Sequence, residues 1–320
     1  MNDLPLMRAW LELARISNLP TVWTNVLAAW AISFGGFQYF QLGMLMLGGS
    51  LLYTAGMILN DVADVTFDRQ FRPERPIPSG KVSLGTAWIV SGLLILGGVA
   101  LMIGPGRSNA WLVLALVTAI VSYDFYHKPW AGSVIVMGAC RSLLYLAAGY
   151  AAGAGRHLRM TAAESSPRFL VDAAPPWHWP NLSWDRDGPL LMHAVVIGLY
   201  IVGLTLVARG ESRPSEQSKG MRVLSRTLLW SPGLMAGAFF LIGGEWQNGL
   251  ILAAFATCVS YATRRMKAGG PAIGEAVGWL LAGIVIVDAL AISSASLPIA
   301  AGIAASAPLL RLWQRKIAAT

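Results

Sequence analysis

The chain has 320 residues, of which 55% are hydrophobic and only 12% charged, and its formal net charge is +8. The charged share is about half that of an ordinary soluble domain, which excludes a soluble globular protein and indicates an integral membrane protein. The positive charge does not indicate nucleic-acid binding, because the basic residues lie in short loops between apolar runs and form no exposed basic domain.

Apolar runs of about 20 residues recur along the whole chain, each long enough to cross a hydrocarbon core of roughly 30 Å as a helix. Only helices or closed barrels satisfy every backbone group in lipid, so we predict an all-α, polytopic bundle of nine or ten spans. Residues 1–320 are expected to form one domain. The predicted spans lie near residues 16–35, 42–62, 83–103, 109–127, 132–153, 189–208, 227–243, 246–263, 275–293 and 297–313.

Lysine and arginine follow every second predicted span, whereas turns such as "GPGRSN" and "GGEW" carry little basic charge. Short cytoplasmic loops collect these residues, so we expect both termini to be cytoplasmic in a multi-pass protein of the cell (inner) membrane. Residues 154–188 break the regular pattern as a long, polar and tryptophan-rich insertion on the opposite side. Its segment "PPWHWPNLSW" is typical of the lipid headgroup layer, where tryptophan is favoured.

The segment "NDVADVTFDRQFRPERPIPSG", residues 60–80, follows the uncharged second span. If the helix continues, Asp61, Asp64 and Asp68 are spaced i, i+3 and i+7 and fall within roughly 60° of one another, with Asn60 beside them. A divalent cation would relieve the repulsion among three carboxylates. The all-oxygen ligand set favours Mg²⁺, which proteins usually bind through a few carboxylates together with substrate phosphates.

Two arginines of the same segment, Arg72 and Arg75, offer forked donors to phosphate oxygens, and the prolines of "RPIPSG" stiffen the loop. A metal and arginines that face each other predict a diphosphate site. The alternative is a solvated helix end whose arginines only anchor the cytoplasmic side. That alternative explains the whole set poorly, because orientation requires basic residues but no acids.

This motif, Asn60-Asp61-x-x-Asp64-x-x-x-Asp68 with Arg72 and then "RPIPSG", closely resembles the first aspartate-rich signature of the UbiA superfamily of intramembrane prenyltransferases. "RISNLPTVWTN", with Arg15, Asn18 and Asn25, is similar to the first helix of that family. "YDFYHK", with Tyr123 and Lys128, is similar to the tyrosine and lysine at the end of its fourth helix. The resemblance covers most of the chain except residues 154–188.

The resemblance implies a helical bundle with a central cavity that opens to lipid and a cytoplasmic polar cap. Members bind a prenyl diphosphate through Mg²⁺, ionise it to an allylic cation and attach the prenyl group to a hydrophobic or aromatic acceptor. By position, the three aspartates would be metal ligands assisted by Asn60. Arg72, Arg75 and Lys128 would then hold the diphosphate, near Tyr123. The expected partners are the donor, the acceptor and membrane lipid, and the sequence does not decide whether there are protein partners.

The chain departs from the family pattern at the end of its sixth span, "LYIVGLTLVARGESRPSEQSKG", where the second aspartate-rich motif belongs. No aspartate is present there, and Glu211 is the only acid close to the helix end. We predict that Arg209, together with Lys128, contacts the diphosphate, and that Glu211 orients Arg209 or contributes to a weakened metal site. A UbiA-like protein with altered or lost catalysis in a biosynthetic assembly is therefore an alternative.

Arg141, in "MGACRSLLY", is a charge deep within the fifth span, and such residues usually face a cavity or a partner. We expect it in or beside the site; the alternative is a structural pair with Asp288 in the ninth span. Asp124 is either a polar group of the cavity or a helix-end residue. Intramembrane charges also occur in transporters, which are a further alternative, but that class favours paired helix breaks in corresponding halves, which are not evident here.

Overall fold

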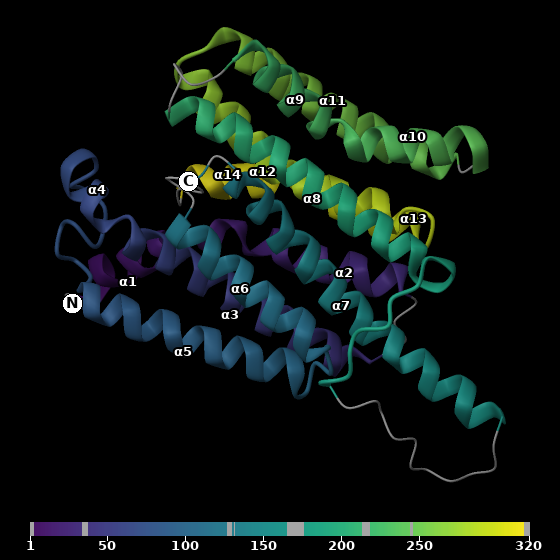
Figure 1. Cartoon of the computed structure of the whole chain (residues 1–320). Coiled ribbons are helices and arrows are strands. Elements are labelled where there is room, and N and C mark those ends of the chain that lie inside the picture. Colours follow the sequence, from purple (N-terminus) through teal and green to yellow (C-terminus); the bar gives the residue numbers. More distant parts are fainter. Residues whose placement is uncertain are drawn as a thin grey trace.

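The structure is a computed structural model that describes residues 3–33, 38–126, 130, 132–164, 176–212, 218–243 and 246–316. Every regular element in these ranges is a helix, and Figure 1 shows the long helices running side by side as a bundle. This all-helical architecture confirms the predicted fold class. The same physical requirement explains it: each helix satisfies its own backbone hydrogen bonds in lipid.

The first half of the chain forms one group of helices whose bounds are α1 (Asp3–Leu13), a 3-10 turn (Ile16–Asn18), α2 (Leu19–Ile32), α3 (Tyr39–Ala63), α4 (Val65–Phe71), α5 (Leu84–Ile103), α6 (Ala110–Tyr126) and α7 (Ser133–Glu164). The second half contains α8 (Trp184–Ser212), α9 (Lys219–Leu229), α10 (Ser231–Gly243), α11 (Gln247–Ala268), α12 (Pro271–Ile292), α13 (Leu297–Ala305) and α14 (Ala307–Lys316).

Helices occupy all ten predicted spans, although Trp230 separates α9 from α10 and Ser306 separates α13 from α14. Five of the described helices are long and apolar enough to cross a membrane: Tyr39–Ala63, Leu84–Ile103, Ser133–Gly153, Trp184–Gly210 and Ala272–Ile292. The helices Ala110–Tyr126 and Ser231–Gly243 are apolar but shorter. The multi-pass character is therefore confirmed, while the number of nine or ten spans stays a prediction.

Two helices lie at the centre of the packing. α2 packs against α3, α7 and α12, and α12 packs in addition against α8, α11, α13 and α14. Buried side chains make up 83% of the apolar window of α12, compared with 22% for α5, so α12 is a core helix and α5 faces lipid along most of its surface. The polar groups of the site are contributed mainly by helices that contact α2.

Small residues allow the closest helix approaches. A Cβ at Gly98 of α5 would lie 2.7 Å from Leu52 Cγ and 3.0 Å from the carbonyl oxygen of Gly48 in α3. A Cβ at Gly138 of α7 would similarly lie 2.7 Å from the carbonyl oxygen of Gly198 in α8. Close contact of small residues is a common way to associate helices in lipid, where burial of apolar surface gives little driving force. These contacts fix α3 and α7, which carry the candidate site.

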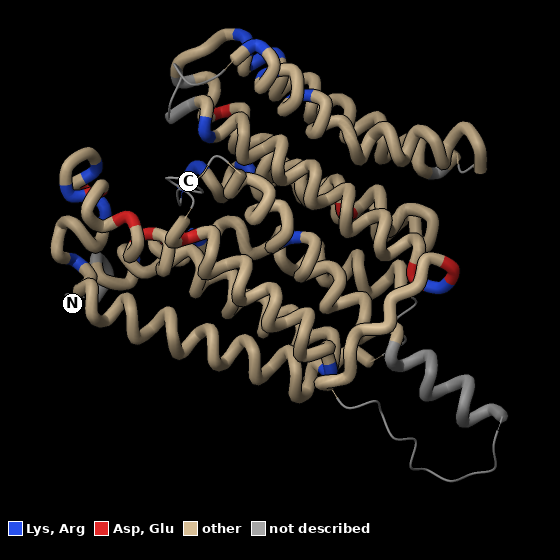
Figure 2. The backbone as a smooth tube through the Cα atoms, viewed as in Figure 1, with Lys and Arg blue, Asp and Glu red and all other residues tan. Residues whose placement is uncertain are grey.

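Charged residues gather at one end of the bundle, as Figure 2 shows for the end that holds α4, the start of α9 and the C-terminal helix. Most of the bundle's length is free of charge in this view. The arrangement fits the predicted collection of basic residues on one side of the membrane.

The predicted insertion at 154–188 is partly helical, because α7 continues to Glu164 and α8 already begins at Trp184. The part of α7 beyond its apolar span, "AGRHLRMTAAE", contains three alanines, two arginines, a leucine, a methionine and a glutamate, which are strong helix formers and extend the helix. Residues 176–183 cover the start of α6: Ala110 N donates to Pro176 O at 2.7 Å, and Asn109 Nδ2 donates to His178 O at 2.6 Å. Trp111 Nε1 donates to Trp177 O at 2.8 Å.

Candidate active site

The aspartate-rich segment forms a nearly continuous helix across the joint between α3 and α4. Asp64 N donates to Asn60 O at 3.0 Å, Asp68 N donates to Asp64 O at 2.9 Å, and Arg72 N donates to Asp68 O at 2.8 Å. Asp64 caps both helices with φ −87° and ψ −1°, which is close to helical. The i, i+3, i+7 spacing therefore does place these carboxylates along one stretch of helix.

The loop after α4 turns back to the membrane within a few residues. Arg72 ends α4, with φ −145° and ψ 57°, which lie outside the helical region. Gly80 has φ 75°, a left-handed conformation that glycine adopts without steric cost. Ser83 then caps α5 by accepting a hydrogen bond from Thr86 N at 3.0 Å. This tight return brings Arg75 over the carboxylates of the helix it has just left.

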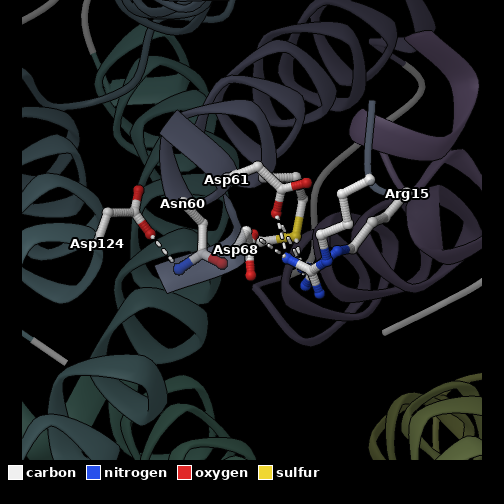
Figure 3. A network of polar contacts seen from close by, with 7 residues as sticks. Arg15, Asn60, Asp61, Asp68 and Asp124 are labelled. Carbon is white, nitrogen blue, oxygen red and sulfur yellow. Dashed lines mark hydrogen bonds and ion pairs between the residues drawn. The ribbon is translucent and has the colours of Figure 1, made fainter. Parts of the chain in front are cut away.

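Two arginines form ion pairs with Asp61 and Asp68; Figure 3 labels both carboxylates and Arg15. Arg75 Nη1 donates to Asp61 Oδ1 at 3.1 Å and to Asp68 Oδ2 at 2.9 Å. Arg15 Nη2 donates to the same oxygen of Asp61 at 3.3 Å. Arg15 comes from the corner between α1 and α2, where its φ is 43°. The network thus ties the N-terminal corner to the end of α3 and to the loop after α4.

The carboxylates lie inside the protein surface: the exposed fractions of Asp61, Asp64 and Asp68 are 7%, 9% and 0%. Burial raises the pKa of Asp68 above its usual value, while the nearby Arg75 guanidinium acts in the opposite direction. Asp68 Oδ1 is buried and has no hydrogen-bond partner among the described residues. A buried acceptor of this kind is costly unless a cation or donor satisfies it.

Asn60 connects the motif to α6, because its Nδ2 donates to Asp124 Oδ1 at 3.4 Å (Figure 3). Asp124 is buried, with 4% of its surface exposed, and it lines the central cavity. The sequence did not decide whether Asp124 is a polar group of the cavity or a helix-end residue. In the structure it lies in the cavity wall. Tyr123 lines the same cavity.

The cavity has a volume of about 230 Å³ and lies between α2, α3, α6, α7, α8 and α12. Most of its wall is apolar. The apolar side chains include Val22, Leu52, Leu116, Ile120, Met137, Leu144, Ile201, Leu204, Val277, Leu281 and Ile284. The polar side chains are Arg15, Asn18, Tyr53, Tyr123, Asp124, Cys140, Arg141 and Thr205. Such a space suits an apolar ligand with few polar groups.

Arg141 belongs to a hydrogen-bonded network at the junction of α2, α7 and α12. Its Nη1 donates to Asn25 Oδ1 at 2.7 Å and to Thr21 O at 3.2 Å, and its Nη2 donates to Thr21 Oγ1 at 2.9 Å. Asp288 Oδ1 accepts from Asn25 Nδ2 at 2.7 Å, and Asp288 Oδ2 accepts from Thr24 Oγ1 at 2.5 Å. The structure thus connects Arg141 to Asp288 through Asn25, and also places Arg141 in the cavity wall.

The remaining predicted site residues are less closely grouped. Arg72 is half-buried beside Asp68 in the chain. Arg209 Nη2 donates to Trp130 O at 3.3 Å, which places the end of α8 against the connection between α6 and α7. Arg209 does not line the cavity described above. Lys128 and the side chain of Glu211 lie outside the described residues.

Within the described ranges, no three histidine, cysteine, aspartate or glutamate side chains come together as a group that could hold a metal ion. The ion pairs with Arg75 and Arg15 occupy Asp61 and Asp68 instead. Arg75 Nη1 nevertheless lies between two carboxylate oxygens, Asp61 Oδ1 and Asp68 Oδ2. These two oxygens and the buried Asp68 Oδ1 are ligand atoms of the kind that a hard divalent cation prefers.

The sequence analysis did not identify several residues that the structure places in this region. Tyr53 lies in the cavity wall, and Arg141 stands 5.8 Å from its ring centroid. Thr21 and Thr24 complete the network around Arg141 and Asp288. Their only signal in the sequence was a run of polar residues in an otherwise apolar span, "LPTVWTNVL". Gln314, near the C-terminus, donates to Asn18 Oδ1 at 3.0 Å and had no local signal.

These features define a membrane-embedded helical protein with an apolar cavity and an adjoining charged network. The network consists of Arg15, Asn60, Asp61, Asp68, Arg75 and Asp124, and we call it the mouth of the cavity. The profile of the UbiA prenyltransferase family matches residues 19–316. The chain therefore belongs to the UbiA prenyltransferase family.

Curated relatives with similar sequences include digeranylgeranylglyceryl phosphate synthase of Methanococcus aeolicus, 29% identical over 133 residues that cover 41% of this chain and 46% of the relative. For the synthase of Saccharolobus solfataricus the identity is 35% over 36% of this chain and 40% of the relative. The chain thus matches about half the length of these relatives or less. 4-Hydroxybenzoate octaprenyltransferase of Cupriavidus necator is 24% identical, with 77% of this chain and 81% of the relative covered.

Solved structures show the same fold. The apo structure of a UbiA homologue from Aeropyrum pernix K1 matches with a TM-score of 0.59 and 16% identity, covering 88% of this chain and 98% of that chain. A structure of digeranylgeranylglyceryl phosphate synthase gives a TM-score of 0.58 at 17% identity, with 90% and 98% coverage. The confirmed points are thus the family and the helical fold.

Proposed function

We propose that this protein transfers a prenyl group from a prenyl diphosphate to a hydrophobic or aromatic acceptor inside the membrane. The main support for this proposal is that the network of carboxylates and arginines lies beside an apolar cavity. Arg15 and Asp124 belong both to this polar network and to the cavity wall. A ligand with a charged head and an apolar tail has complementary surroundings there.

Asn60, Asp61, Asp64 and Asp68 would hold Mg²⁺ in this proposal. Their chemistry fits this ion, since the carboxylates and the Asn60 amide offer oxygen ligands, and Asp68 Oδ1 is buried without a hydrogen-bond partner among the described residues. When bound, Mg²⁺ supplies charge neutralisation for the leaving diphosphate. Arg72, Arg75, Lys128 and Arg209 are the proposed donors to the diphosphate oxygens. Glu211 is proposed to orient Arg209.

The reaction breaks the bond between the allylic carbon and the diphosphate oxygen, and its electron pair leaves with the diphosphate. A new bond forms between that carbon and an electron-rich atom of the acceptor, which then loses a proton. The chain's own contribution is to fix positive charge around the departing oxygens and to keep water from the cation. The apolar wall formed by residues such as Leu116, Ile120 and Leu204 suits the second task.

The acceptor is proposed to be aromatic or lipid-like, as the names of the relatives indicate for those proteins. A second candidate function is a UbiA-like protein with altered or lost catalysis, and the absence of aspartate at the end of α8 favours it. Purified protein in lipid nanodiscs separates the two. With geranylgeranyl diphosphate and Mg²⁺, a prenyltransferase cleaves the donor and releases pyrophosphate, and chelation stops the release. No release above that of the Asp64→Asn variant would contradict the proposal.

We further propose that the mouth of the cavity and both termini face the cytoplasm of a cell (inner) membrane. Single cysteines at exposed Ser79 and Asn181, in a background in which Cys140 and Cys258 are replaced by alanine, test this sidedness. A membrane-impermeant thiol reagent should label Ser79→Cys from the cytoplasm and Asn181→Cys only from the other face. Labelling of both from one side would contradict it.

A further inference from the structure

Three arginines gather around one carboxylate at the end of the bundle that holds the C-terminal helix (Figure 2). Arg265 of α11 donates from Nε to Oε2 of Glu275, at the start of α12, at 2.9 Å. Tyr261 Oη donates to the other oxygen, Glu275 Oε1, at 2.8 Å. Arg311 of α14 interacts electrostatically with Glu275 and with Arg315 of its own helix. We call these three arginines the arginine cluster; it carries three positive charges beside one negative charge.

Positive charge is in excess throughout these helix ends. The sequences of α11 and α14 contain no acidic residue, and the other acid of α12, Asp288, is bonded to Thr24 and Asn25. Arg311 and Arg315 are spaced i, i+4 on one helix, where like charges repel and destabilise the helix. Further exposed basic residues of α11 and α14 are Arg264, Lys267 and Lys316. The arginine cluster is therefore suited to an additional anion.

Buried N–H donors lie beside the cluster without an acceptor. Arg311 Nε is buried and has no hydrogen-bond partner among the described residues. Its guanidinium lies against the backbone of α12, since a Cβ at Gly278 would be 2.8 Å from Arg311 Nη2. Nε1 of Trp279 is likewise buried without a partner in the described part of the chain, and the Trp279 ring packs edge-on against Tyr261 with centroids 5.7 Å apart. Buried donors without an acceptor are costly, so a ligand that supplies acceptor oxygens would be favoured here.

Exposed apolar side chains stand next to the arginines on α14. Leu309 and Leu312 are 68% and 55% exposed, whereas Leu310 and Gln314, on the opposite side of the helix, are buried. Leucines that face outward from a membrane protein contact acyl chains, and arginines beside them reach the level of the headgroups. The surface therefore offers apolar and cationic groups in the order in which a phospholipid presents its chains and its phosphate.

We infer that the arginine cluster binds the phosphate of an anionic phospholipid from the surrounding membrane. The guanidinium groups of Arg311 and Arg315 would donate to the phosphate oxygens, and the acyl chains would lie along Leu309 and Leu312. An anionic headgroup suits the site better than a zwitterionic one, because the cluster holds two positive charges more than Glu275 balances. The inference rests on the membrane-embedded fold and not on the proposed prenyl transfer.

The bound lipid would also secure α14 against the cavity. On the buried side of this helix, Gln314 Nε2 donates to Oδ1 of Asn18, which lines the cavity. A phosphate between Arg311 and Arg315 would relieve their repulsion and so stabilise the helix that carries Gln314. We therefore expect anionic lipid to raise the melting temperature of the protein.

The test is native mass spectrometry of the full chain in detergent, titrated with phosphatidylglycerol or with phosphatidylcholine of the same acyl chains. Each basic residue beside an anionic lipid contributes about fivefold in affinity, so two surplus charges should give phosphatidylglycerol a preference of at least about tenfold. Inorganic phosphate distinguishes a free anion from a lipid: at millimolar concentration it should leave phosphatidylglycerol bound. Equal affinity for the two lipids, or displacement of phosphatidylglycerol by phosphate, would overturn the inference.

Variants assign the preference to the cluster. Arg311→Gln/Arg315→Gln should lower it at least about fivefold and abolish the rise in melting temperature that phosphatidylglycerol gives in nanodiscs. Lys219→Gln/Arg222→Gln is the matched control, because it removes two exposed charges from the start of α9 at the same end of the bundle, and it should keep both effects. Equal losses in the two double variants would mean that overall charge, and not this site, selects the lipid.

A single substitution keeps the test decisive if Arg311→Gln/Arg315→Gln does not fold. Arg315 is exposed, so Arg315→Gln should fold as the parent does and lower the lipid preference about fivefold. An unchanged preference in Arg315→Gln would overturn the assignment of the phosphate to the arginine cluster.

Discussion

The mouth of the cavity and the network around Arg141 use charge in opposite ways. At the mouth, Asp61 and Asp68 contact Arg75 directly, and Asp61 also contacts Arg15. Around Arg141, an amide and hydroxyl groups separate one cation from one carboxylate. The first arrangement brings carboxylates and guanidinium groups into direct contact. The second holds a balanced pair whose cation remains accessible to the cavity.

The depth of each region explains the difference. α4 and the loop after it lie at the charged end of the bundle (Figure 2), where direct ion pairs with arginine compensate the buried carboxylates of Asp61 and Asp68. The Arg141 network lies among α2, α7 and α12, where an unbalanced charge is expensive. The two regions should therefore respond differently to the loss of one group. A substitution at the mouth should lower catalytic activity, and a substitution in the network around Arg141 should lower the free energy of unfolding.

The largest effect is expected for Asp64→Asn. The substitution removes one of three carboxylates at the joint between α3 and α4 but keeps a residue that caps helices well. We expect Mg²⁺-dependent pyrophosphate release to fall by about a hundredfold or more. Mutation even of a residue that only supports a metal ligand typically lowers metal affinity or activity by 10- to 100-fold. Release is measured at limiting and saturating Mg²⁺, with folding checked by thermal melting.

Asp185→Asn is the matched control, since this exposed aspartate lies at the start of α8, outside the carboxylate network. It should leave both turnover and the Mg²⁺ dependence unchanged. Near-normal activity of Asp64→Asn at limiting Mg²⁺ would remove the proposed metal role of this residue.

The inner network should respond in stability to Thr24→Val. Thr24 Oγ1 donates to Asp288 Oδ2 at 2.5 Å, and the substitution keeps the shape while it leaves this buried carboxylate oxygen without that donor. Loss of one partner of a buried charged group should lower the free energy of unfolding by about 1–3 kcal/mol. Unfolding of the protein in mixed detergent micelles measures the change.

The control for this loss is Thr118→Val on the exposed side of α6, where the hydroxyl donates only to Leu114 O of its own helix at 2.9 Å. Its effect should stay within about 0.5 kcal/mol. Equal losses for the two threonines would show that the contact with Asp288 contributes nothing specific.

The two regions also differ in how far the sequence predicts them. Most of the mouth lies in residues 60–80, so helical periodicity placed its carboxylates on one stretch of helix, with Arg72 and Arg75 close to them in the chain. Arg15 and Asp124 come from other parts of the chain. The Arg141 network joins residues that are 116 and 263 positions apart along the chain, and helix packing decides that contact. The sequence marked Arg141 and Asp288 as intramembrane charges and Asn25 as part of the first-helix motif, but it did not predict the hydrogen bonds that join the three.

The same distinction applies to the fold. Hydropathy placed helices in all ten predicted segments, because each segment's apolar character is a local property. The continuation of α7 to Glu164 was missed, because the span criterion registers apolar residues and not helix propensity. The cavity also could not be predicted, since its wall combines side chains from six helices. The roles of the individual site residues remain predictions.

A smaller effect is expected at the contact that fixes α3, the helix that leads into the mouth. Gly98→Ala in α5 adds a Cβ 2.7 Å from Leu52 Cγ and 3.0 Å from Gly48 O, so the two helices must separate. We expect a loss of about 1–3 kcal/mol in the free energy of unfolding, partly offset by the higher helix propensity of alanine. Gly92→Ala in the same helix has nothing within 4 Å of the added atom and should be neutral or stabilising. A neutral Gly98→Ala would mean that this close approach does not set the position of α3.

The smallest effect is expected for Arg209→Ala, which tests whether a fixed cation replaces the missing carboxylates at the end of α8. The diphosphate charge that a second metal would neutralise must be met by other groups, and Arg209 lies where the second motif would begin. Its contact with Trp130 O at 3.3 Å holds it against the connection that follows Lys128, the other proposed diphosphate ligand. Because Arg209 is half exposed, solvent screens its charge, and donor affinity should fall only about three- to tenfold. Calorimetric titration with a non-hydrolysable prenyl diphosphate analogue measures this change, and Arg222→Ala in the exposed part of α9 is the control. An unchanged affinity in Arg209→Ala, or an equal loss in Arg222→Ala, would show that Arg209 acts as a membrane-side anchor and not as a diphosphate ligand.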